Sequence, residues 1–349
     1  MPSDGIGGLM VTPSGAVVVS GRSVSDAHDL FSAFSFESGK QLWEYQYKAV
    51  ASLDYGNSPR ATPVYSEGVL VTLGASGVVT GLDATSGVPL WTLELSREFR
   101  VPVPTWGFSG SPLVIEGQVL LQVADAPALI SIDLFSGKLN WKVSGDPAAY
   151  ASLMPVVNET HVVGVSENGY FLRRVSDGRL VWSAEPNQEG DFGVATPVMV
   201  PGGVVFTSEN NGVQLFGREK EDLSQASLDF NESLLPDSHT PVAVGNQLLV
   251  ADHGLHSLRL QDGLREAWVI AEEYIHSYAS IIASSNRALV TTEDGRWLLA
   301  STVSNEKGKI LDHQPLSSKR TRVLAHPAVH EDCIFVRVAN QIRCYRLPR

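Results

Sequence analysis

A unit of about 44 residues recurs along the chain, and this repeat constrains the fold more than any other feature of the sequence. Each unit opens on a short apolar run, usually Thr-Pro-Val, that leads into a glycine turn. The opening prolines stand at 63, 112, 155, 197, 241 and 327, at steps of 42 to 49 residues apart from one double step of 86. Met10 and Ile281 take the same place in two further units. The sequence therefore predicts eight units, with openings near 10, 63, 112, 155, 197, 241, 281 and 327.

A second motif, Asp-x-x-x-Gly-x-x-x-Trp in its clearest copies, follows each opening by about 28 residues. Each unit thus holds four short strands, which is the content of one propeller blade. We predict an all-β, eight-bladed β-propeller of four-stranded antiparallel blades, forming a single domain over residues 1–349. A flat indole on the outer strand can fill the wedge between blades and donate its N–H to a neighbouring carbonyl. We expect this structural role for Trp43, Trp91, Trp141, Trp182 and Trp268.

The Gly-Lys-x-x-Trp motif with its Thr-Pro-Val opening resembles the repeat of the pyrroloquinoline-quinone-like (quinoprotein-type) propellers. The stretch from Pro102 to Pro112 is similar to that of non-catalytic bacterial envelope members, such as a lipoprotein that assists outer-membrane barrel assembly. The resemblance implies a bacterial protein of the periplasm, or a secreted one. The N-terminus has neither a basic nor an apolar region, so we expect no signal peptide in the sequence given.

The eighth unit stops at residues 344–349, about where a third strand should end. Residues 1–7 are too polar and rich in glycine to supply a closing strand. We therefore expect either an upstream tryptophan strand outside the sequence given or a last blade of three strands. Cys333 and Cys344 lie on one predicted hairpin of this unit, where they could form a disulfide. We favour the alternative of two small core residues.

Quinone-dependent oxidation is the first activity that the resemblance raises. Such dehydrogenases carry adjacent cysteines near the cofactor and hold calcium with acidic and amide groups, and this chain has no adjacent cysteine pair. We expect no catalytic, cofactor or metal site, with pyrroloquinoline quinone and calcium as the alternative. A net charge of -12 argues against nucleic-acid binding. No apolar stretch approaches the roughly 20 residues of a membrane-spanning helix, and we expect a monomer with a protein partner.

Two groups of residues are candidate sites. Four precede repeat openings on different blades and could line the central channel for a small anion, or could bind loop carbonyls instead: Arg60, His239, His276 and His326. The first two connections from tryptophan to proline, of 20 and 21 residues, exceed the next two, of 14 and 15. Their aromatic and arginine side chains indicate a partner face or a lid over the channel: Tyr45, Tyr47, Tyr55, Arg97, Phe99, Arg100, Trp106 and Phe108.

The function that we predict is a non-catalytic scaffold or protein-binding module of a bacterial envelope or secreted setting. A quinone-dependent dehydrogenase-like protein and a small-anion sensor that uses the channel are the alternatives.

Overall fold

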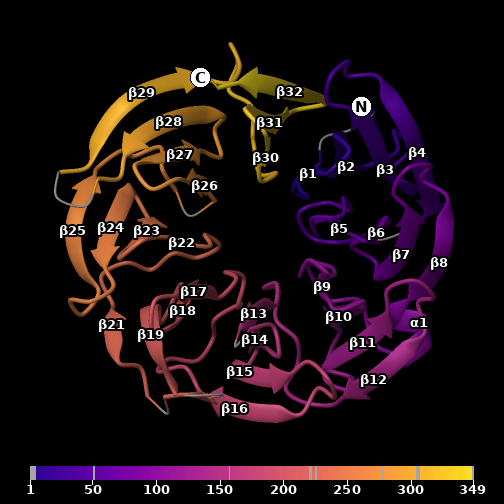
Figure 1. The fold of residues 1–349 in the computed structure, drawn as a ribbon, viewed down its shortest axis with the longest axis horizontal. Helices are drawn as coiled ribbons and strands as arrows, with labels where there is room; N and C mark the ends of the chain where they lie inside the picture. The colour runs from indigo at the N-terminus through magenta and orange to yellow at the C-terminus, as the bar shows by residue number, and fades with distance from the viewer. Residues whose placement is uncertain are drawn as a thin grey trace. The chain divides into compact units, whose positions relative to one another are not determined.

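The computed structural model describes residues 5–49, 52–156, 158–219, 222–224, 226–276, 278–303 and 307–347. These residues form strands β1 to β32 and one short helix, α1 (Leu95–Phe99). The chain divides into two compact units, residues 1–147 with 324–349 (unit 1) and residues 148–323 (unit 2). Figure 1 shows the course of the chain by colour. A single domain over the whole chain stays a prediction.

Unit 1 contains four antiparallel sheets in which strands adjacent in sequence are neighbours (Figure 1). The first contains β1 (Met10–Val11), β2 (Ala16–Arg22), β3 (His28–Ser35) and β4 (Gln41–Lys48). The second contains β5 (Val64–Ser66), β6 (Val69–Leu73), β7 (Val78–Asp83) and β8 (Pro89–Glu94). The third contains β9 (Leu113–Ile115), β10 (Gln118–Gln122), β11 (Leu129–Asp133) and β12 (Leu139–Val143). The last contains β30 (Ala328–His330), β31 (Cys333–Val338) and β32 (Gln341–Arg346).

Unit 2 contains the other four sheets. The fourth sheet along the chain contains β13 (Met154–Val156), β14 (His161–Ser166), β15 (Gly169–Arg174) and β16 (Leu180–Ala184). The fifth contains β17 (Val198–Val200), β18 (Gly203–Ser208), β19 (Gly212–Glu219) and β20 (Asp222–Leu223), with β21 (Asp229–Asn231) also paired to β19. The sixth contains β22 (Val242–Val244), β23 (Gln247–Ala251), β24 (Leu255–Arg259) and β25 (Arg265–Ile270), and the seventh contains β26 (Ser280–Ala283), β27 (Arg287–Thr291), β28 (Arg296–Ser301) and β29 (Lys309–Pro315). The eight sheets confirm the predicted all-β class, an eight-bladed β-propeller whose last blade has three strands among the described residues.

Burial follows the position of a strand within its blade. The second strands are buried along their whole length, as β2 and β14 show, because both faces of each sheet are covered. The fourth strands alternate between exposed and buried residues, as in β4, since only their inner side chains reach a neighbouring sheet. Apolar residues from adjacent blades therefore form continuous clusters, such as the one that joins Val17 and Val19 of β2 to Phe335 of β31.

The repeat tryptophans lie in one register. In the first blade Met10 pairs with Val18, Val18 with Ala33, and Ala33 with Trp43. The same row ends at Trp91 in the second blade and at Trp141, Trp182 and Trp268 in the third, fourth and sixth. A register shift follows the tryptophan partner in each of these blades, between Ala33 and Phe34 in the first. The fixed spacing in the sequence thus becomes a fixed place on the outer strand.

Three of these indoles donate a hydrogen bond to the next blade. The expectation is wrong in this respect for Trp268, whose buried Nε1 has no hydrogen-bond partner among the described residues. Trp43 donates its Nε1–H to the Ala84 carbonyl over 3.1 Å, and Trp91 does the same to the Leu134 carbonyl over 2.8 Å. Each acceptor begins the glycine turn of the next blade, and the Trp43 ring lies against Gly87 of that turn. Gly87 has φ +70, so glycine is needed both for this backbone conformation and for the close approach of the ring. In unit 2, Trp182 donates to the Ser224 carbonyl over 3.1 Å.

Candidate functional site

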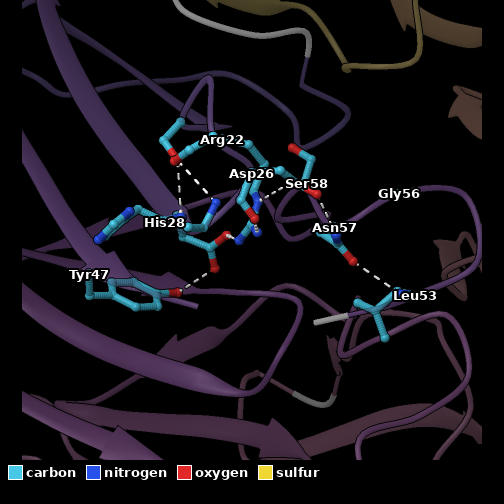
Figure 2. Close-up of polar contacts among 12 residues, drawn as sticks. Arg22, Asp26, His28, Tyr47, Leu53, Gly56, Asn57 and Ser58 are labelled. Carbon is cyan, nitrogen blue, oxygen red and sulfur yellow. Dashed lines mark hydrogen bonds and ion pairs between the residues drawn. The ribbon is translucent and has the colours of Figure 1, made fainter. Parts of the chain in front are cut away.

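A buried ion pair lies beneath one end of the first blade (Figure 2). Arg22 ends β2, Asp29 lies near the start of β3, and their side chains are only 5% and 1% exposed. The Arg22 guanidinium donates to the Asp29 carboxylate over 2.7 Å. It also donates to the Asp26 carboxylate over 2.8 Å and to the Asp26 carbonyl. One arginine therefore binds both the base and the tip of the β2–β3 turn.

Tyr47 of β4 completes the buried part of this group. Its hydroxyl donates to the second carboxylate oxygen of Asp29 over 2.8 Å. Desolvation raises the pKa of Asp29, although the hydrogen bonds from Arg22 and Tyr47 oppose that rise. Desolvation, with the Asp29 charge, also holds the pKa of Tyr47 well above its ordinary value, so the phenol stays protonated and acts as a donor. A side chain at Gly74 would collide with the Tyr47 hydroxyl and Asp29.

The turn between β2 and β3 is connected to the first long loop, residues 52–63. Asn57 donates from Nδ2 to the Asp26 carboxylate over 2.7 Å, and its Oδ1 accepts the Leu53 amide over 3.0 Å (Figure 2). The hydrogen bond from Arg22, together with that from Asn57, lowers the pKa of Asp26. The buried ion pair thus fixes a turn, and the turn fixes the loop.

Arg60 holds the tip of the same loop. Its guanidinium donates to the carbonyls of Asp54 and Gly56 over 2.8 and 2.9 Å, and to the Ser58 carbonyl over 2.8 Å. The first two carbonyls flank Tyr55, which has φ +63, a conformation that a bulky residue seldom adopts. Tyr55 is 73% exposed. The arginine therefore supports an uncommon backbone conformation that presents a tyrosine to solvent.

The second long loop, residues 100–112, lies against the first. The Trp106 and Tyr55 rings meet edge to face, with centroids 6.2 Å apart and planes at 69°. Gly107 approaches Leu53 closely, and the Phe108 amide donates to the Ala75 carbonyl over 2.9 Å. Phe108 is buried in the core shared by the second and third blades. The prediction that the two long loops emerge on the same side is consistent with these contacts, which hold Trp106 beside Tyr55.

The other residues of the expected partner face have different settings. Tyr45 and Tyr47 lie on β4, which continues to Lys48, and not on the loop that the tryptophan-to-proline spacing suggested. Arg97 and Phe99 belong to α1, and the Phe99 ring lies 5.6 Å from the Lys142 ammonium. Arg100 caps α1 in the left-handed conformation and is exposed. We define the two-loop face as the exposed side chains of Tyr55, Arg97 and Arg100 together with the half-buried Trp106.

The four expected channel residues are divided between the units. In unit 1, Arg60 donates to the loop carbonyls described above, and the carbonyl of His326 accepts the Leu9 amide. In unit 2, Nδ1 of the buried His239 donates to the Ala279 carbonyl over 2.9 Å, and the His276 ring lies 6.0 Å from that of His253. For Arg60 and His239, these contacts match the expected alternative in which the side chains bind loop carbonyls.

The cysteines correct one expectation. Both are free thiols, and only Cys333 is buried, whereas Cys344 is exposed. Cys344 is therefore not a core residue. The two are diagonal neighbours across the β31–β32 ladder, because Cys333 pairs with Arg346 and Phe335 pairs with Cys344.

The described residues do not fit a calcium-bound quinone. Calcium takes six to eight oxygen ligands, yet no three His, Cys, Asp or Glu residues in the described ranges lie close enough together to hold a metal ion. We therefore derive no reaction step through such a cofactor. Among these residues there is also no helix of the length and apolarity that crossing a membrane requires.

Sequence reasoning missed the residues beneath the two-loop face: Arg22, Asp26, Asp29 and Asn57. A signal for two of them was present, because Arg22 and Asp29 are charged residues that flank a short turn between two strongly apolar strands. Charges in such strands are rarely buried unless they are paired. Asn57, 31 residues from its partner Asp26, has no such signal.

Known proteins resemble this chain in sequence and in fold. The family model described as outer membrane protein assembly factor BamB matches residues 26–269. BamB of Escherichia coli strain K12 is 26% identical over 182 residues, which cover 51% of this chain and 42% of the relative. The chain thus spans about half the length of the curated relatives it matches.

Two solved structures show the fold. BamB from Moraxella catarrhalis superposes with a TM-score of 0.69 at 14% identity, over 99% of this chain and 94% of that one. A europium-containing methanol dehydrogenase gives 0.68 at 13% identity, over 96% and 84%. The same fold therefore supports an assembly factor and an enzyme, and fold alone does not separate the two. The match to the family model, which covers more than half of the sequence, shows that this chain belongs to the BamB family of outer membrane protein assembly factors.

Proposed function

We propose that the protein is a non-catalytic β-propeller scaffold of a bacterial cell envelope that binds a protein partner through the two-loop face. The family match supports a role in the assembly of outer membrane proteins and a periplasmic location. The observation that carries the choice of surface is the Tyr55–Trp106 pair, because one ring is largely exposed and both belong to loops held by hydrogen bonds to unit 1.

The chemistry of this surface favours a protein ligand. Exposed tyrosine, tryptophan and arginine dominate the energetics of protein interfaces because they bury a large area and form specific polar contacts. A side chain that is already fixed loses little conformational entropy on binding. The Arg60 and Asn57 contacts fix the loop of Tyr55 before any partner arrives. The two-loop face is therefore preorganised for binding.

Site-specific photo-crosslinking in living cells tests this proposal. A benzophenone amino acid at position 55 should form an adduct with an envelope protein, whereas the same group at Lys138 should not. Lys138 is exposed on the turn between β11 and β12, at the other end of its blade. Arg100→Glu and Trp106→Ala should each reduce the adduct from position 55 at least fivefold without lowering the melting temperature by more than a few degrees.

Equal adducts from positions 55 and 138, or an adduct insensitive to Arg100→Glu, would overturn the choice of face. The non-catalytic part has its own test, the calorimetric titration of pyrroloquinoline quinone with calcium into the purified chain. Saturable binding at micromolar concentration would contradict it.

A further inference from the structure

The backbone of the two-loop face is largely engaged in hydrogen bonds of its own. The Arg60 guanidinium binds three carbonyls of the first long loop, those of Asp54, Gly56 and Ser58. The amides of Gly56 and Gly107 donate to carbonyls of their own loops. In the second loop, Pro102 and Pro104 have no N–H to offer. Neither residues 52–63 nor residues 100–112 contain a strand.

The aromatic pair of this face is fixed before any ligand arrives. The Tyr55 ring is 73% exposed, and its backbone conformation, φ +63, is held by Arg60. The Trp106 ring meets it edge to face, with centroids 6.2 Å apart and planes at 69°. In this arrangement the two rings do not cover each other's faces, so the Tyr55 ring keeps most of its surface open to solvent.

Two backbone hydrogen bonds attach α1 and the second long loop to the turn between β6 and β7. The Leu95 amide donates to the Gly77 carbonyl over 2.9 Å, and the Phe108 amide donates to the Ala75 carbonyl over 2.9 Å. The chain between these two anchors therefore leaves one turn and returns to it. The residues of the two-loop face that lie in this stretch are Arg97, Arg100 and Trp106.

The charge of the two loops differs from that of the whole chain, which is -12. The stretch from 95 to 112 carries Arg97 and Arg100 against Glu98, and the first loop carries Arg60 against Asp54. Both Arg97 and Arg100 are exposed, and neither forms an ion pair with a carboxylate among the described residues. Arginine binds carboxylates through two parallel hydrogen bonds. Acidic groups of a ligand would therefore be complementary to these two residues.

These properties discriminate between the ways in which a protein recognises a peptide. A strand adds to an edge that presents a row of unpaired backbone groups, and the two loops contain no strand edge. A helix needs an apolar groove for side chains spaced at three and four residues, but apart from the aromatic pair only Val103, 37% exposed, adds a large apolar side chain here. A polyproline II segment has a solvated backbone without internal hydrogen bonds and docks its prolines on aromatic rings.

We propose that the two-loop face binds a proline-rich segment of its partner protein in the polyproline II conformation. The prolines pack on the Tyr55 and Trp106 rings, and acidic residues that flank them pair with Arg97 and Arg100. This inference rests on the proposed function of the two-loop face and names the chemistry of the partner segment. Both sides are ordered before they meet, so little conformational entropy is lost on binding.

Fluorescence anisotropy with the purified chain tests this inference. The probe is a labelled peptide of eight prolines with one glutamate at each end and uncharged termini, and it should bind saturably. The same peptide with lysine in place of glutamate should bind at least tenfold more weakly, because it meets the two arginines. A peptide with glycine and serine in place of the prolines should also bind at least tenfold more weakly, because it is a flexible coil.

Two sets of variants separate the rings from the charges. Tyr55→Asn removes the ring and introduces a residue that adopts the left-handed conformation of this position more readily. It should weaken binding of the glutamate peptide at least tenfold. Arg97→Glu combined with Arg100→Glu should reverse the preference, so that the lysine peptide binds more tightly than the glutamate peptide.

Phe135→Asn is the matched control. Phe135 is another exposed aromatic residue, 51% exposed, and it lies in the turn between β11 and β12. Its substitution should leave peptide binding unchanged. An equal loss of affinity for Phe135→Asn and Tyr55→Asn would show that prolines adhere to any exposed ring, and would overturn the inference.

Two further results would also overturn it: no saturable binding up to millimolar concentration, or equal affinities of the glutamate and lysine peptides. Mapping of the crosslink from position 55 separates this inference from the proposed function. An adduct in a partner segment without proline would refute the inference and leave the proposed function intact. Peptide binding without any adduct from position 55 would instead refute the proposed function, because the peptide titration requires no partner protein.

Discussion

Gly87→Ala should weaken the joint between the first and second blades. Alanine in the left-handed conformation of this position, φ +70, costs about 1 kcal/mol. Its Cβ would also lie 2.6 Å from the Trp43 ring, which must then move. Movement of the ring disrupts the hydrogen bond from Trp43 to the Ala84 carbonyl, which contributes about 1 kcal/mol. Partial exposure of an indole that is now buried adds about another 1 kcal/mol.

The expected loss of stability is therefore about 3 kcal/mol for Gly87→Ala. Gly117→Ala isolates the backbone part of this effect, because Gly117 has φ +72 and open space around its Cβ position. Its expected loss is about 1 kcal/mol. The difference of about 2 kcal/mol is the contribution of the indole packing.

Urea denaturation followed by far-ultraviolet circular dichroism measures the stability of both variants. Their shifts in urea midpoint are converted to free energies of unfolding with one shared m value. A second substitution, Trp43→Phe, should destabilise the Gly87→Ala variant less than it destabilises the parent, because the two residues share one contact. Equal stabilities of the two glycine variants, or additive effects of Gly87→Ala and Trp43→Phe, would refute the reasoning that indole packing joins the blades.

Three further predictions concern charge and protonation. Asp29→Asn should cost about 3 kcal/mol because it removes the buried partner of the Arg22 charge and leaves only the more exposed Asp26 carboxylate. Arg22→Met combined with Asp29→Leu should cost less, and urea midpoints in the opposite order would contradict this. The hydrogen bond from Ser86 lowers the pKa of Asp83. The stability that the ionised Asp83 adds to the fold is therefore fully present above the unfolded-state pKa of about 3.9, and it is lost as the pH falls through the lower pKa of the folded state. The free energies of unfolding of Asp83→Ala and of the parent protein, measured from pH 7 to 2, should therefore converge in acid. A difference between them that stays constant with pH would argue against this role of Asp83. Desolvation and the neighbouring thiol of Cys333 raise the pKa of Cys344 to about 11. Alkylation of Cys344 at pH 8 should therefore be roughly 100-fold slower than that of an ordinary thiol. The prediction fails if the alkylation rate levels off below pH 10.

The sequence allowed the blades to be predicted because their determinants are local. The Asp83 turn illustrates this, since its carboxylate binds the Ser86 amide and hydroxyl three residues away. The glycine that follows has a conformation that few other residues adopt, and the tryptophan lies four residues further on. A pattern of this kind repeats in the sequence with the same period as the fold, so its period reveals the number of blades.

The contacts of the two-loop face could not be predicted in the same way. The hydrogen bond from Asn57 to Asp26 joins residues 31 positions apart, in a turn and a loop that belong to neither of the two repeated motifs. The sequence makes Arg60 a candidate anion ligand because it lies within five residues before a repeat opening, at Pro63. Its actual partners are the carbonyls on both sides of Tyr55, which depend on an irregular loop conformation that the repeat does not encode.

The buried Arg22–Asp29 pair links the stability of unit 1 to the two-loop face. A buried ion pair contributes little net stability, because desolvation of the two charges offsets most of their attraction. Apolar residues of similar size would therefore serve the core about as well. They could not bind the Asp26 turn, and that turn is what holds Asn57 and the loop of Tyr55. If the ion pair serves folding alone, the variant with Arg22→Met and Asp29→Leu should still form the crosslink from position 55. If the ion pair fixes the loop, as we infer, this variant should fold but lose that crosslink.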